Sequence, residues 1–108
     1  SLMHEIALVN AVAQSFIAEM DGKPVSAVVL AIGPKVERDV ATSAWETMVA
    51  GTSIESAALD FIDVLDELQC LECSAKYPGM RLTQCPKCGG TGLVVGEAEE
   101  VSLASWTA

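Results

Sequence analysis

Apolar residues recur at spacings of three and four in two parts of the chain, which is the pattern of an amphipathic helix. The first part covers residues 3–20 and ends at Asp21-Gly22-Lys23-Pro24, where glycine permits a left-handed cap and proline cannot continue a helix. The second covers about residues 39–50 and ends at Gly51. The predicted apolar stripes are Ile6, Val9, Val12, Ala13, Phe16, Ile17 and Met20 in the first helix, and Val40, Ala44, Trp45 and Met48 in the second.

Strands are predicted where β-branched residues cluster between turn residues. Residues 25–32 are rich in valine and isoleucine and are closed by Gly33-Pro34. A second strand, about Val101 to Trp106, ends the chain. Residues 57–68 are ambiguous, because their apolar positions fit a helical stripe while the segment could also be a strand that leads into the first cysteine. We predict a strand there, on the strength of the family resemblance described below.

Residues 69–95 contain all four cysteines and few large apolar side chains, so this segment needs a cross-link to fold. The cysteines form two pairs, Cys70-x2-Cys73 and Cys85-x2-Cys88, and eleven residues separate the pairs. Each pair can bind one ion from a single turn of backbone, and together they complete a tetrahedral zinc shell with Zn–S distances of about 2.3 Å. Such a closed shell is structural, because no position is left for a substrate. Iron in the same shell and two disulfides are the alternatives to zinc.

The charge of the chain is −9, from 15 acidic and 6 basic residues, and a surface this acidic repels the phosphate backbone of nucleic acids. The cysteine segment carries only Lys76, Arg81 and Lys87 as bases and Tyr77 as its aromatic residue, which is little for nucleic-acid binding. No apolar run approaches the ~20 residues that span a membrane, and no secretory signal is recognisable. We therefore expect a cytoplasmic protein that binds no nucleic acid and no membrane, with reduced thiols.

The only histidine, His4, directly follows Met3. Ser1 and Leu2 resemble a remnant of expression, so we expect Met3 to be the natural first residue. The amine of Met3, the backbone nitrogen of His4 and its imidazole can then form fused chelate rings, and the backbone nitrogen of Glu5 can complete a planar set of four nitrogens. This geometry suits Ni(II) or Cu(II) better than zinc. The Glu5 carboxylate can orient the imidazole, or it can simply be an acidic residue favoured by the helix dipole.

Taken in order, these features resemble the HypA-type family of hydrogenase nickel-incorporation proteins. The resemblance covers nearly the whole chain, and its most specific part is the pair of cysteine motifs. It implies an α+β fold, in which both chain ends form a small sheet with two helices, and a zinc-ribbon lobe is inserted between them. The expected domains are a nickel-binding domain of residues 1–68 and 96–108 and a zinc-binding domain of residues 69–95. The resemblance is carried by Met3-His4-Glu5, Val28-Val29-Leu30-Ala31-Ile32-Gly33, Ser43-Ala44-Trp45-Glu46, both cysteine pairs and the strand Val101–Trp106.

The resemblance also implies metal ligands. Nickel is expected on His4, with support from Glu5 and with backbone nitrogens at the terminus, Met3 included. Glu37 is expected either to tune this site, as an acid does in some relatives, or to be a solvated loop residue. Zinc is expected on Cys70, Cys73, Cys85 and Cys88.

The function implied by the resemblance is that of a nickel metallochaperone for [NiFe]-hydrogenase, and in some relatives also for urease. The implied partners are a nickel-handling GTPase and the large subunit of the hydrogenase, and a homodimer is one of the states to be tested. We expect no enzyme activity, because the chain offers no pair of nucleophile and base and no phosphate-binding glycine loop. Two alternatives remain: a zinc-ribbon interaction module without a nickel role, and a rubredoxin-like iron electron carrier.

Overall fold

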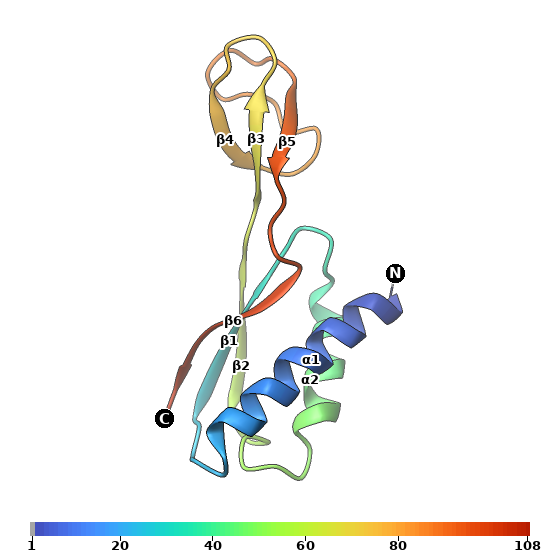
Figure 1. Ribbon diagram of the computed structural model, residues 1–108, viewed down its shortest axis with the longest axis vertical. Helices are drawn as coiled ribbons and strands as arrows, with labels where there is room; N and C mark the ends of the chain where they lie inside the picture. The colour runs from blue at the N-terminus through green and yellow to red at the C-terminus, as the bar shows by residue number, and fades with distance from the viewer. Residues whose placement is uncertain (1) are drawn as a thin grey trace.

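The computed structural model describes residues 2–108, which form two three-stranded sheets at opposite ends of an elongated molecule of 53 × 27 × 18 Å (Figure 1). The first sheet has the strand order β2-β1-β6 and the second has the order β4-β3-β5. The elements in chain order are α1 (Leu2–Met20), β1 (Ala27–Ile32), α2 (Arg38–Val49), β2 (Ala58–Asp63), β3 (Asp66–Cys70), β4 (Lys76–Gly79), β5 (Gly92–Gly96) and β6 (Val101–Thr107).

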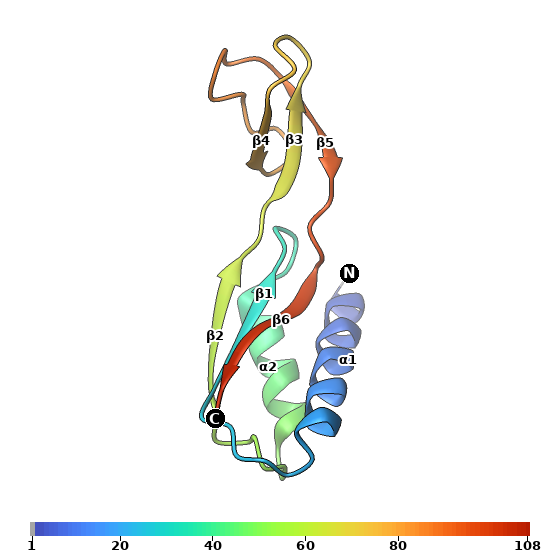
Figure 2. The ribbon, with the colours of Figure 1, turned by 60° about the vertical axis from the view of Figure 1, so that its left-hand side comes forward.

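The first sheet is built from both ends of the chain. Its central strand β1 pairs in parallel with β2 and antiparallel with β6, so that Ile32 lies between Asp63 and Val101. Both helices cover the same face of this sheet (Figure 2). The predicted α+β fold, with a small sheet, two helices and a separate lobe that carries the cysteines, is confirmed.

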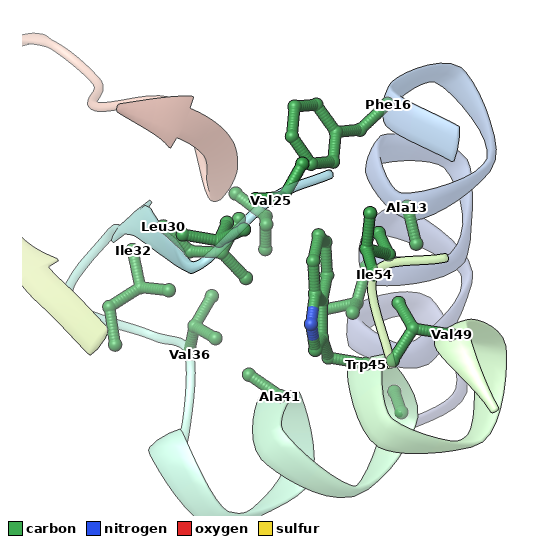
Figure 3. Packing of buried hydrophobic residues seen from close by; sticks show 14 of the residues in the cluster. Ala13, Phe16, Val25, Leu30, Ile32, Val36, Ala41, Trp45, Val49 and Ile54 are labelled. Atoms are coloured by element: carbon green, nitrogen blue, oxygen red, sulfur yellow. The ribbon is translucent and has the colours of Figure 1, made fainter. Parts of the chain in front are cut away.

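The main hydrophobic core lies between this sheet and the two helices. Alternate residues of β1, namely Val28, Leu30 and Ile32, are almost fully buried, as expected for the covered face of a strand. The indole of Trp45 is 2% exposed and lies among side chains from α1, α2 and the sheet (Figure 3). Its ring centroid is 6.4 Å from that of Phe16, so α1 and α2 meet through these two aromatic residues.

Both predicted helices are present, but α2 is turned slightly from the expected face. Ala41 and Val49 are buried, whereas Val40 and Met48 are only half-buried. The reason is that Ala41, Trp45 and Val49 are four residues apart and form one ridge, which is the ridge that packs against the core.

Residues 58–63 form strand β2, so the prediction of a strand in the ambiguous segment is confirmed. After Val64 and Leu65 the chain enters β3 and the second sheet. The predicted domain boundary at residue 68 therefore falls within β3, while the boundary at residue 96 coincides with the end of β5. The division into two domains stays a prediction, and the second sheet has its own small cluster of buried residues, Leu68, Cys70, Tyr77 and Cys85.

The burial of Trp45 predicts that its loss destabilises the protein more than the loss of Trp106 does. Trp45→Ala removes a fully buried ring and should lower the free energy of unfolding by about 3–5 kcal/mol. Trp106 is 42% exposed and touches Phe16 edge-on, so Trp106→Ala should cost less than half as much. Urea unfolding followed by circular dichroism measures both variants, and equal losses would contradict this account of the core.

Candidate metal centre

The four cysteines meet at the end of the second sheet. Their sulfur atoms all lie within 4.8 Å of one another, and the Cys70–Cys88 and Cys73–Cys85 pairs are 3.5 Å and 3.6 Å apart. A tetrahedral ion with metal–sulfur bonds of about 2.3 Å would place its sulfurs about 3.8 Å apart. A disulfide needs an S–S bond of about 2.05 Å, and all four cysteines are free thiols here. The donor set therefore fits a single tetrahedral metal ion.

Each cysteine pair is folded into a tight turn that directs backbone amides at its first sulfur. The amide of Glu72 donates to Cys70 Sγ and that of Lys87 donates to Cys85 Sγ, both at 3.4 Å. Such N–H groups stabilise a thiolate. Each turn thus offers one buried sulfur, from Cys70 or Cys85, and one exposed sulfur.

The thiols cannot all ionise together without a cation. Amides of Cys73 and Glu72 lower the pKa of Cys70 to about 7. The amide of Gly90 lowers the pKa of Cys88, but the sulfurs of Cys70 and Cys73 and burial outweigh it and raise this pKa to about 12. Interacting groups at such distances share their protons, so a neutral solution leaves the metal-free cluster partly protonated. A bound divalent ion would compensate the negative charge of the thiolates.

Two neighbours keep the cluster compact. A Cβ at Gly90 would lie 2.6 Å from Glu72 Oε2 and 3.1 Å from Cys70 Sγ, so only glycine fits there without a shift. Tyr77 is buried beside the sulfurs, and its hydroxyl donates to the carbonyl oxygen of Thr83 at 2.6 Å. Burial, and then the nearby thiolates, raise the pKa of Tyr77, so this donor keeps its proton. Its supporting role has no signal in the sequence apart from its place between the cysteine pairs.

The residues predicted to bind nickel lie in the first turn of α1, at the end of the helix nearer to the second sheet (Figures 1 and 2). Met3 is 81% exposed. The imidazole Nε2 of His4 lies 3.1 Å from Oε2 of Glu100, a residue that sequence analysis did not single out. The Oε2 atom of Glu5 is buried and has no hydrogen-bond partner within residues 2–108. A buried carboxylate oxygen without a partner is costly, which favours a cation or a donor at this position.

Glu37, the other acidic residue considered for the nickel site, makes no side-chain hydrogen bond or ion pair within residues 2–108. It is the exposed N-cap residue of α2 and its side chain makes no capping hydrogen bond. No helix of residues 2–108 combines the length and the apolar character needed to cross a membrane.

The fold and the four-thiol cluster define a small metal-binding protein. Residues 3–108 match the family model described as hydrogenase/urease nickel incorporation, metallochaperone, HypA. The chain therefore belongs to the HypA family, which confirms the resemblance drawn from the sequence.

Individual proteins agree with this assignment. The chain is 32% identical to hydrogenase maturation factor HypA of Rhodobacter capsulatus over 107 residues, covering 94% of this chain and 95% of that protein. It is also 32% identical to the protein of the same name from Geobacter sp. (strain M21) over 104 residues, covering 94% of each.

The solved structures with a similar fold include the solution structure of the Ni metallochaperone HypA from Helicobacter pylori. Its TM-score is 0.59 at 23% identity, and the match covers 95% of both chains. A second solution structure of a HypA protein has a TM-score of 0.54 at 22% identity, covering 94% of this chain and 90% of that one. These two likenesses support the fold.

Metal removal should unfold the second sheet and spare the first. A strong chelator should remove the chemical-shift dispersion of the amide resonances of residues 66–96, because a buried cluster of only four side chains holds this part together without the ion. Residues of the main core should keep their resonances. Cys88→Ala should have the same effect, and Lys87→Ala, at a position between two ligands, is the matched control. Dispersed resonances for residues 66–96 in metal-free protein would contradict this prediction.

Proposed function

We propose that this protein is a nickel metallochaperone of hydrogenase maturation, which carries nickel on its N-terminal residues and is held in shape by zinc on Cys70, Cys73, Cys85 and Cys88. The match of residues 3–108 to the HypA family carries this proposal. The functions for which the relatives are named, hydrogenase maturation and nickel handling, support it.

Zinc is the ion that best fits the cysteine cluster. Four thiolates in a tetrahedral arrangement are typical of structural zinc, and when bound it cross-links β3 to the loop before β5. The closed shell leaves no position for cargo. The backbone amides of Glu72 and Lys87 hold the sulfurs in place, and Gly90 and Tyr77 close the space around them.

Nickel is proposed to bind to Met3, His4 and Glu5. The first four amides of a helix have no acceptor within that helix, so the backbone nitrogens of this turn are available without breaking helical hydrogen bonds. A set of amine, amide and imidazole nitrogens supports the square-planar geometry that Ni(II) favours. The exposure of Met3 and of the His4 side chain, which is 57% exposed, lets a partner reach the ion.

The remaining steps of the function concern partners. We propose that the protein exchanges nickel with a GTPase and delivers it to the large subunit of a [NiFe]-hydrogenase in the cytoplasm, with urease as a second target. The charge of −9 favours basic partner surfaces. The protein would act by transfer and would catalyse no reaction. A homodimer is the alternative to a monomer.

Nickel titration by calorimetry tests the cargo site. A chain that begins at Met3 should bind one Ni²⁺ tightly, and His4→Ala should abolish this binding because the imidazole is its only side-chain nitrogen ligand. The form with Ser1-Leu2 should bind more weakly, since it lacks a free amine on Met3. Equal binding by all three proteins, or none, would favour a zinc-ribbon interaction module.

Elemental analysis tests the other metal. Protein purified without chelators should contain about one zinc per chain, and the Cys88→Ala variant should contain much less. Acidification should release zinc, because protons compete with the metal for the thiolates and this competition grows as the pH falls. Iron in place of zinc, with visible charge-transfer absorption, would instead favour an electron carrier.

A further inference from the structure

The contact between His4 and Glu100 joins the first turn of α1 to the segment that returns from the second sheet. Imidazole Nε2 lies 3.1 Å from the carboxylate, within hydrogen-bonding distance. Both side chains are partly exposed, at 57% for His4 and 40% for Glu100. An exposed polar contact of this kind adds little stability. Its main consequence is therefore for the proton position of the imidazole and not for the free energy of unfolding.

Covalent geometry decides which imidazole nitrogen can bind nickel. A chelate that includes the backbone nitrogen of His4 closes a six-membered ring through Nδ1 of the same residue, whereas Nε2 lies on the far side of the ring and cannot close it. The metal-binding form of His4 must therefore carry its proton on Nε2. That is the nitrogen that faces Glu100.

The backbone of Glu100 is fixed by the first sheet. Its carbonyl oxygen accepts a hydrogen bond from the amide of Gly33 at 2.9 Å. Gly33 is buried, and a Cβ there would lie 3.0 Å from the carbonyl oxygen of Glu99, so the two segments touch closely. Val101, the next residue, begins β6 and pairs with Ile32. The backbone that carries the carboxylate is thus hydrogen-bonded to the first sheet just before the start of β6.

We propose that Glu100 is a positioning residue for the cargo nickel: it accepts the Nε2 proton of His4, fixes the imidazole tautomer with Nδ1 as the metal-binding atom, and holds the ring in place. The inference rests on the proposed function. From the sequence, Glu5 was the candidate for orienting the imidazole, and we now assign this role to Glu100. The buried Oε2 atom of Glu5 has no hydrogen-bond partner within residues 2–108, so it makes no such contact with His4. Partners that orient a ligating histidine typically affect metal affinity by about 10–100-fold.

The test compares Glu100→Ala, Glu100→Gln and the matched control Glu99→Gln in zinc-loaded chains that begin at Met3. Calorimetry with Ni²⁺ should show affinity about tenfold or more weaker for Glu100→Ala. Glu100→Gln should recover most of the affinity, because its amide oxygen still accepts the proton. Glu99→Gln removes the same charge one residue away and should stay within about twofold of the parent chain.

A second readout follows the imidazole itself. Because His4 is the only histidine, its long-range ¹H–¹⁵N correlations report directly which nitrogen carries the proton. In nickel-free protein at a pH where the ring is neutral, the parent chain should show the Nε2-protonated form, and Glu100→Ala should show a mixture of tautomers. A purely structural role of Glu100 would leave the tautomer unchanged.

The outcomes separate the two proposals. If His4→Ala binds nickel as well as the parent chain, the proposed cargo site is wrong. If His4→Ala loses nickel while Glu100→Ala matches Glu99→Gln in affinity and keeps the parent tautomer, the role of Glu100 is overturned and the cargo site stands. Loss of affinity in Glu100→Ala with the tautomer change supports the inference.

Discussion

The convergence of four cysteine sulfurs, all within 4.8 Å of one another, is the constraint on which the second sheet of this structure depends. The buried cluster of the second sheet contains only Leu68, Cys70, Tyr77 and Cys85, so two of its four members are themselves proposed metal ligands. So small an apolar core supplies little stability. The first sheet, by contrast, is covered by two helices and has a much larger apolar core around Trp45. We therefore expect the two sheets to be stabilised by different forces.

The segments that connect the two sheets are short and are hydrogen-bonded to the first sheet. The amide of Val64 donates to the Ile32 carbonyl and that of Gly33 to the Glu100 carbonyl, both at 2.9 Å. Asp66 accepts from the amide of Ala98 at 2.8 Å, which ties the outgoing and returning segments together. Helix α1 begins beside this junction, so His4 reaches Glu100 there. The N-terminal residues thus lie where the segments that lead to and from the second sheet meet the first sheet.

Local patterns were sufficient to predict both helices, β1, β6 and the four-cysteine site, because periodicity and motif spacing are encoded within a few residues. The ambiguity of residues 57–68 has a physical cause. Its apparent helical stripe mixes Phe61, which packs on the main core, with the exposed Ile62 and with Leu68, which is buried in the other cluster. Glu100 could not be predicted, since its contact with His4 joins opposite ends of the chain and leaves no local signal.

The two proposed sites have opposite requirements, and their positions meet them. A structural ion should never leave, and two of its proposed ligands, Cys70 and Cys85, are buried within a closed set of four cysteines. A cargo ion must leave, and the first turn of α1 offers exposed groups and backbone nitrogens that a partner can displace one by one. Such an open site risks a disordered ligand. The carboxylate of Glu100, just before the start of β6, reduces that risk in our proposal, because it orders the imidazole of His4 before the metal arrives without adding a bond that must be broken on release.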